Sequence, residues 1–161
     1  MTIKAGERIP AGKLKLMGPD GPMNVEAAEL LGRGRVVLFS VPGAFTPTCD
    51  EKHLPGFVDK AADLGRKGVD RIVCLAVNDV FVMHAWGKSQ GVGDAIAMAA
   101  DGNGDYTRAL GLELDARGYG LGMRGQRFAL VIDDGVVKQV HVEAPGEFKV
   151  SGAEHLLESL G

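Results

Sequence analysis

The residues most able to do chemistry lie in one short stretch that ends in a cysteine. Residues 42–49 read PGAFTPTC and directly follow the apolar run 36–39. The apolar run predicts a buried strand, and the prolines and glycine predict a loop after it. Acidic residues and a helical pattern follow Cys49, so we expect Cys49 in the first turn of a helix. There, free backbone N–H groups and the positive end of the helix dipole favour a thiolate, which is the nucleophilic form of cysteine.

The neighbours of Cys49 could complete a site for attack on a small molecule. Thr46 could aim its hydroxyl at the point that the sulfur faces, Pro42 could shield that point, and the backbone N–H groups of Thr48 and Cys49 could face it. A reactive thiolate also needs a fixed cation. Arg127 is the candidate, because it begins a predicted core strand after a glycine-rich loop. Its position in the sequence alone would equally fit a surface ion pair.

The elements that must position these residues alternate between strand and helix. Apolar periodicity and turn residues predict strands at 13–17, 23–25, 36–40, 71–77, 95–99, 127–132 and 136–143. Helices are predicted at 25–31, 51–67 with a kink or break at Pro55, 80–91, 105–112 and 151–160. The last helix begins with a capping box made by Ser151 and Glu154. Residues 117–126 are too rich in glycine to predict regular structure.

This order predicts an α/β fold with a mixed central sheet flanked by helices, in a single domain over residues 1–161. We expect parallel pairing among the early strands and an antiparallel hairpin at one edge.

A net charge of −3 without a basic stripe gives no reason to expect nucleic acid, and no run is long enough to span a membrane. Two cysteines are too few for a disulfide framework, and no metal-ligand spacing is present. We therefore expect a reducing cytoplasm and neither metal nor cofactor.

The stretch 42–49 resembles the P-x-x-x-T-x-x-C signature of the peroxiredoxins. The flanking segments His53–Phe57, Cys74–Asp79 and Asp134–Lys138 are similar to the type II, peroxiredoxin-5-like branch, and the likeness covers essentially the whole chain. It implies a thioredoxin-like fold and thiol-dependent reduction of hydrogen peroxide and alkyl hydroperoxides through a sulfenic acid.

The resemblance also implies a role for each candidate residue. Cys49 would be the peroxidatic cysteine, Thr46 would orient the peroxide, Pro42 would shield the sulfur and Arg127 would stabilise the thiolate and the transition state. Thr48 would support substrate binding, and His53 would lie beside the site, although a place on the helix surface fits His53 nearly as well. The family habit also favours a homodimer held around the active-site loops, with Phe45, Phe81 and Trp86 close to them in sequence.

Two questions remain open from the sequence. Cys74 lies mid-strand, where a structural core cysteine is the favoured interpretation and a resolving thiol the alternative. The reductant could be glutathione with glutaredoxin, which a one-cysteine cycle favours, or thioredoxin.

A redox sensor is a rival function, but the chain lacks an appended interaction segment. A disulfide oxidoreductase is a second rival, but that activity needs a C-x-x-C pair and residues 50–52 contain no cysteine.

Overall fold

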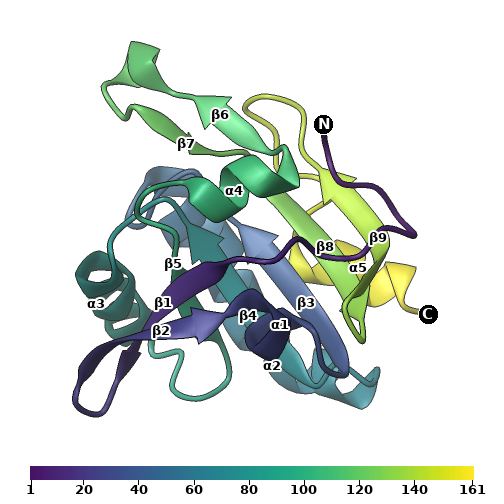
Figure 1. Cartoon of the computed structure of the whole chain (residues 1–161). Helices are drawn as coiled ribbons and strands as arrows, with labels where there is room; N and C mark the ends of the chain where they lie inside the picture. The colour runs from purple at the N-terminus through teal and green to yellow at the C-terminus, as the bar shows by residue number, and fades with distance from the viewer.

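The structure is a computed structural model that describes all 161 residues. At its centre lies a mixed sheet of seven strands (Figure 1). The strand order is β2-β1-β5-β4-β3-β8-β9. Strands β3, β4 and β5 run parallel, whereas β1–β2 and β8–β9 form antiparallel hairpins at the two edges. The predicted mixed sheet is confirmed. The sequence predicted an antiparallel hairpin at one edge, and the structure has one at each edge.

The strands of the sheet are β1 Lys13–Gly18, β2 Gly21–Glu26, β3 Arg35–Ser40, β4 Arg71–Ala76, β5 Ala97–Ala100, β8 Phe128–Asp133 and β9 Val136–Val142. The helices are α1 Ala27–Leu31, α2 Leu54–Arg66, α3 Val80–Gln90, α4 Asp105–Leu110 and α5 Ala153–Ser159. None of these helices combines the length and the apolar character needed to cross a membrane.

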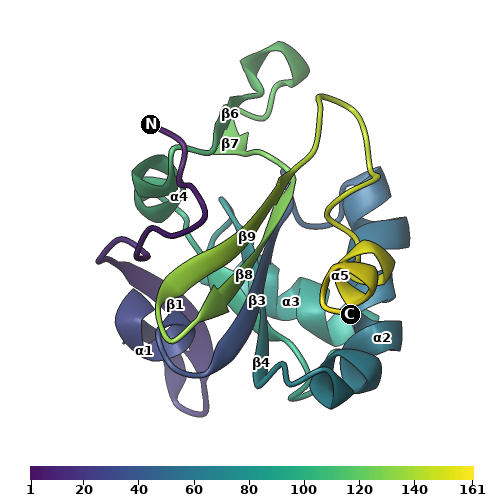
Figure 2. The ribbon, with the colours of Figure 1, turned by 90° about the vertical axis from the view of Figure 1, so that its right-hand side faces the viewer.

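The sheet is buried on both faces, which is why the inner residues of β3, β4 and β8 are continuously apolar rather than alternating. Successive side chains of a strand point to opposite faces. Val37 and Phe39 pack on one face in the same core cluster as Cys49, whereas Val36 and Leu38 pack on the other. Helices α2, α3 and α5 cover the first face, and α1 and α4 lie across the second (Figure 2).

The helix that follows the loop after β3 is irregular at its start. A π-helical turn, η1 Cys49–His53, precedes α2, and the Leu54 N–H bonds to the Cys49 carbonyl five residues back. Proline has no N–H to donate, and its ring crowds the carbonyl four residues before it. The irregularity predicted at Pro55 is therefore present as a widened turn directly before that residue.

Two sequence predictions about local structure are wrong. Residues 117–126 are not irregular throughout, because β7 Met123–Gly125 pairs with β6 Glu113–Asp115 and the short 3₁₀ turn η2 Arg117–Tyr119 lies between them. Gly120 and Gly122 have φ values of 73° and 71°, so glycine serves the turn of this hairpin rather than preventing it.

The predicted capping box is absent. Helix α5 begins at Ala153 with Gly152 as its N-cap and no side-chain cap. The hydroxyl of Ser151 donates instead to Glu143, at 2.7 Å. The sequence predicts Ser151 as a helix cap because nothing in the local pattern indicates a partner eight positions earlier in the chain.

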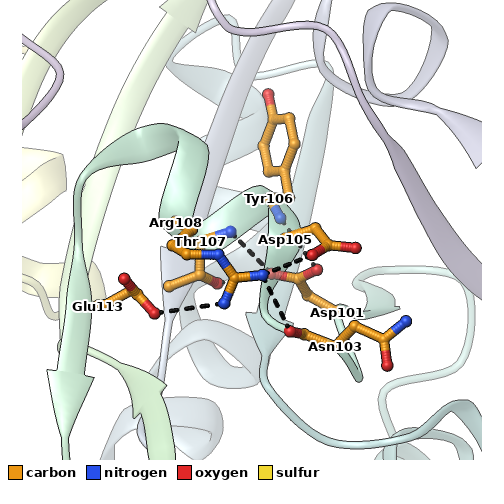
Figure 3. A network of polar contacts seen from close by, with 7 residues as sticks. All are labelled: Asp101, Asn103, Asp105, Tyr106, Thr107, Arg108 and Glu113. Carbon is orange, nitrogen blue, oxygen red and sulfur yellow. Dashed lines mark hydrogen bonds and ion pairs between the residues drawn. The ribbon is translucent and has the colours of Figure 1, made fainter.

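A buried carboxylate, Asp101, holds the start of α4, and an ion pair links the same helix to β6 (Figure 3). Asp101, only 5% exposed, accepts hydrogen bonds from the Tyr106 N–H and from the Thr107 N–H and hydroxyl at the start of α4. Arg108, on the same helix, reaches Glu113 of β6 at 3.5 Å. Helix α4 is thus held at its start by buried hydrogen bonds and contacts β6 through a partly exposed ion pair.

Candidate active site

Cys49 lies at the end of a loop that leaves the carboxyl end of β3, and its side chain is fully buried. The loop is held by short bonds: the Thr46 hydroxyl donates to the Gly43 carbonyl at 2.7 Å, and the Asp50 N–H donates to the Thr46 carbonyl at 2.8 Å. The backbone N–H groups of Thr48 and Cys49 have no acceptor within the protein. They are the free donors of a helix N-terminus, as predicted.

Arg127 supplies the cation of the site. It directly precedes Phe128 in β8, so it is in phase with Ala129 and Val131, which pack on the face that holds Cys49. Its Nη2 donates to the Cys49 Sγ at 3.0 Å. No carboxylate pairs with this guanidinium. Its positive charge is therefore available to a thiolate.

His53 joins Arg127 from the last position of the π turn. The ring is fully buried among Phe39, Phe57 and Phe148, with centroids 4.9, 5.7 and 4.9 Å away. Its Nε2 lies 3.0 Å from the Ser151 carbonyl, which can only accept, so Nε2 carries the proton. Its Nδ1 then accepts from Arg127 Nη1 at 2.7 Å.

The environment of His53 keeps the ring neutral. Burial, together with the charge of Arg127, lowers the pKa of His53 to about 3. A neutral imidazole can take a hydrogen bond from the guanidinium, whereas an imidazolium would repel it. Of the two positions left open by the sequence, the structure places His53 within the site.

A second arginine, which the sequence reasoning missed, braces the loop. Arg124 on β7 donates through Nη1 to the Pro42 carbonyl at 3.3 Å and through Nε to the Leu121 carbonyl at 2.8 Å. A Cβ at Gly43 would come within 2.9 Å of the same guanidinium, so a larger residue at this position would displace the end of the Arg124 side chain. Arg124 was missed because its segment was predicted to be irregular.

Asp50, next to the reactive residue, ties the π turn to α3. Its Oδ1 accepts from Trp86 Nε1 at 2.8 Å and from Gln90 Nε2 at 2.9 Å. The Trp86 side chain is fully buried, so its expected contribution to a dimer surface is wrong. Phe45 and Phe81 are 51% and 63% exposed.

Cys74 lies in the core of the sheet, on the face that holds Cys49. It is opposite Phe39 in the sheet register and belongs to the same core cluster as Cys49. Burial, with a smaller contribution from Cys49, raises the pKa of the Cys74 thiol well above its usual value, so this sulfur stays protonated.

A buried cysteine with an adjacent fixed cation and free backbone donors, carried by a layered mixed sheet, defines a thiol-based redox enzyme. The whole-chain comparisons make this specific. The Redoxin family model matches residues 4–157. Peroxiredoxin-2B of Arabidopsis thaliana is 47% identical, with 98% of each chain covered.

Solved structures agree with these matches. Reduced Prx3 in complex with hydrogen peroxide from Vibrio vulnificus has a TM-score of 0.95 and 48% identity over 99% of this chain and 100% of that one. Peroxiredoxin 5 from Alvinella pompejana has a TM-score of 0.86 and 34% identity over 98% and 97% of the two chains. The chain belongs to the type II, peroxiredoxin-5-like peroxiredoxins. It has the thioredoxin-like fold and is a thiol-dependent peroxidase that takes hydroperoxide substrates and thiol reductants.

Proposed function

We propose that the Cys49 thiolate attacks the terminal oxygen of a hydroperoxide, ROOH. The S–O bond forms as the O–O bond breaks, and the RO⁻ fragment leaves and takes a proton as ROH, which is water when R is hydrogen. The sulfur is oxidised to a sulfenic acid and the peroxide is reduced. The observation that carries this proposal is the 3.0 Å hydrogen bond from Arg127 Nη2 to the Cys49 Sγ.

The loop would bind the peroxide in line with the sulfur. Because the Thr46 hydroxyl donates its proton to the Gly43 carbonyl, its lone pairs remain to accept the peroxide O–H. The unpartnered N–H groups of Thr48 and Cys49 can donate to the peroxide oxygens. Pro42, half-buried and braced by Arg124, would limit the access of water.

The test is peroxide consumption by Cys49→Ser beside its matched control Cys74→Ser. We expect Cys49→Ser to be inactive and folded, because serine keeps the size and loses the thiolate. Cys74→Ser should keep the activity of the parent protein. Substantial turnover by Cys49→Ser would overturn the assignment.

For the reductive half of the cycle we propose glutathione with glutaredoxin. Glutathione would attack the sulfenic acid to give a mixed disulfide and water, and a second thiol would release the Cys49 thiol and form a glutathione disulfide. The support is that Cys74, the one other cysteine, is fully buried and held protonated, which makes it a poor resolving nucleophile. Turnover with glutathione and glutaredoxin, set beside thioredoxin with its reductase, tests the choice.

Peptide mapping after peroxide treatment without thiol provides an independent check. We expect sulfenic and then sulfinic mass additions on Cys49. A quantitative Cys49–Cys74 disulfide would replace this scheme with a two-cysteine cycle.

We further propose a cytoplasmic homodimer of one-domain chains. Phe45 is exposed on the active-site loop and Phe81 at the start of α3, so both are free to contact a second copy. The cytoplasmic location rests on the low number of cysteines. Sedimentation at micromolar concentration and cell fractionation test the two statements, and a chain that sediments only as a monomer contradicts the first.

A further inference from the structure

Glu143 is a buried carboxylate with no cationic partner and no contact with Cys49. It directly follows β9 and is only 7% exposed. Its oxygens accept from four donors: the N–H groups of Lys149, Val150 and Ser151, at 2.7–2.9 Å, and the Ser151 hydroxyl at 2.7 Å. Although burial alone would raise the pKa of Glu143, hydrogen bonds from Ser151, Lys149 and Val150 lower it, so the group is a carboxylate at neutral pH.

The backbone of Glu143 is bonded directly to that of the active-site arginine. The Glu143 N–H donates to the Arg127 carbonyl at 3.0 Å, which continues the β8–β9 ladder by one pair. The same residue thus holds the backbone of Arg127 with its N–H and the loop 149–151 with its carboxylate.

The loop, together with Arg127, determines which nitrogen of His53 carries the proton, because a guanidinium can only donate to Nδ1. The Ser151 carbonyl accepts from His53 Nε2 at 3.0 Å. With the proton fixed on Nε2, the lone pair of Nδ1 faces Arg127 and accepts from Nη1 at 2.7 Å. This bond orients the planar guanidinium so that Nη2 faces the Cys49 sulfur.

The hydrogen bonds close a ring. They run from the Arg127 side chain to His53, from His53 to the Ser151 carbonyl, from the Ser151 N–H to the Glu143 carboxylate, and from the Glu143 N–H back to the Arg127 carbonyl. We propose that Glu143 is a positioning residue for the peroxidase reaction, acting through the Ser151 carbonyl and the tautomer of His53 on the guanidinium of Arg127. This inference rests on the proposed role of Arg127 at Cys49.

The first test is the rate of the peroxide reaction in Glu143→Gln. A glutamine keeps one acceptor oxygen but presents an NH₂ group to N–H donors, so the loop and the Ser151 carbonyl should shift. Because small misplacements of a reacting group cost up to about a hundredfold in rate, we expect a loss of about tenfold. The matched control is Glu147→Gln in the same loop, where the carboxylate is exposed and reaches only Lys149 Nζ at 3.7 Å. The control should react at the parent rate.

A double-mutant cycle separates positioning from general structural damage. In an Arg127→Ala background, Glu143→Gln should slow the reaction by less than about twofold, because the group through which it acts is absent. A full tenfold effect in that background would overturn the inference and leave the proposed function intact. If Arg127→Ala alone reacts at the parent rate, the proposed role of Arg127 fails first.

The ¹⁵N chemical shifts of His53 provide a readout that a merely structural role would not change. The parent protein should show a protonated Nε2 and an unprotonated Nδ1, and Glu143→Gln should show both nitrogens moving toward averaged values. Unchanged shifts in a folded, slower variant would refute the proposed action of Glu143 through His53.

A second variant is available if Glu143→Gln does not fold, because Ser151→Ala removes only the hydroxyl bond. It should slow the reaction in the same direction by a smaller factor, and a parent rate for Ser151→Ala with unaltered His53 shifts would count against Glu143.

Discussion

Replacement of Arg127 by lysine tests the chemistry of the site most directly. The guanidinium donates to two acceptors at once, the Cys49 sulfur at 3.0 Å and His53 Nδ1 at 2.7 Å. A lysine ammonium keeps the charge but lacks the planar fork that can serve both. Hydrogen bonds that involve a charged group contribute about 1.5–3 kcal/mol each. Loss of one such bond in the transition state therefore predicts a rate about ten- to 150-fold lower.

The assay is the second-order rate of oxidation by hydrogen peroxide, measured by stopped flow as a function of pH. Weaker stabilisation of the anionic sulfur should also displace the rising limb of the pH profile to higher pH. Arg117→Lys is the matched control, because Arg117 lies in the turn of the β6–β7 hairpin and pairs with Asp115 in solvent. A rate for Arg127→Lys within twofold of the parent, with an unshifted profile, would refute the reasoning.

Three further predictions concern stability and spectroscopy. Asp101→Ala leaves three donors unpaired, two of them on Thr107, and should destabilise the fold by about 2–4 kcal/mol in urea titration. The pKa of His53 is about 3 when folded and 6.5 ordinarily, so the unfolded chain takes up the proton first. Stability should therefore fall as the pH drops below about 6.5, by up to about 1.4 kcal/mol per pH unit. His53→Gln should lose this contribution and the exposed His84→Gln should keep it. Trp86 is the one tryptophan and bonds to Asp50 beside the reactive sulfur, so peroxide should change its fluorescence. A serine at position 49 should abolish that change.

The order of strands and helices followed from the sequence because the core strands are apolar and the helices are separated by glycines and prolines. The hairpin β6–β7 did not, because its strands are three residues long and its glycines are equally typical of loops. Propensity is a weak guide for so short an element.

The site was predictable only in part. The loop and Cys49 are local features, and their spacing can be read from the chain. Arg127 is 78 residues from Cys49, and only the family resemblance favoured it over a surface ion pair. Glu143 carries no local signal, because its carboxylate acts on a loop six to eight residues further on and through that loop on His53. Such partners are determined by tertiary structure and not by spacing.

The π turn at Cys49–His53 has a geometric consequence for where the sulfur points. In an unbroken α-helix each residue turns about 100°, so Cys49 would lie about 80° around the axis from Phe57, eight positions later. A π turn accommodates one additional residue, which brings Cys49 to within about 20° of Phe57 and thus onto the inward face of the helix. A regular helix here would gain standard hydrogen bonding and aim the sulfur away from Arg127. At Cys49–His53 the chain therefore cannot form a regular α-helix and also direct the Cys49 sulfur toward Arg127.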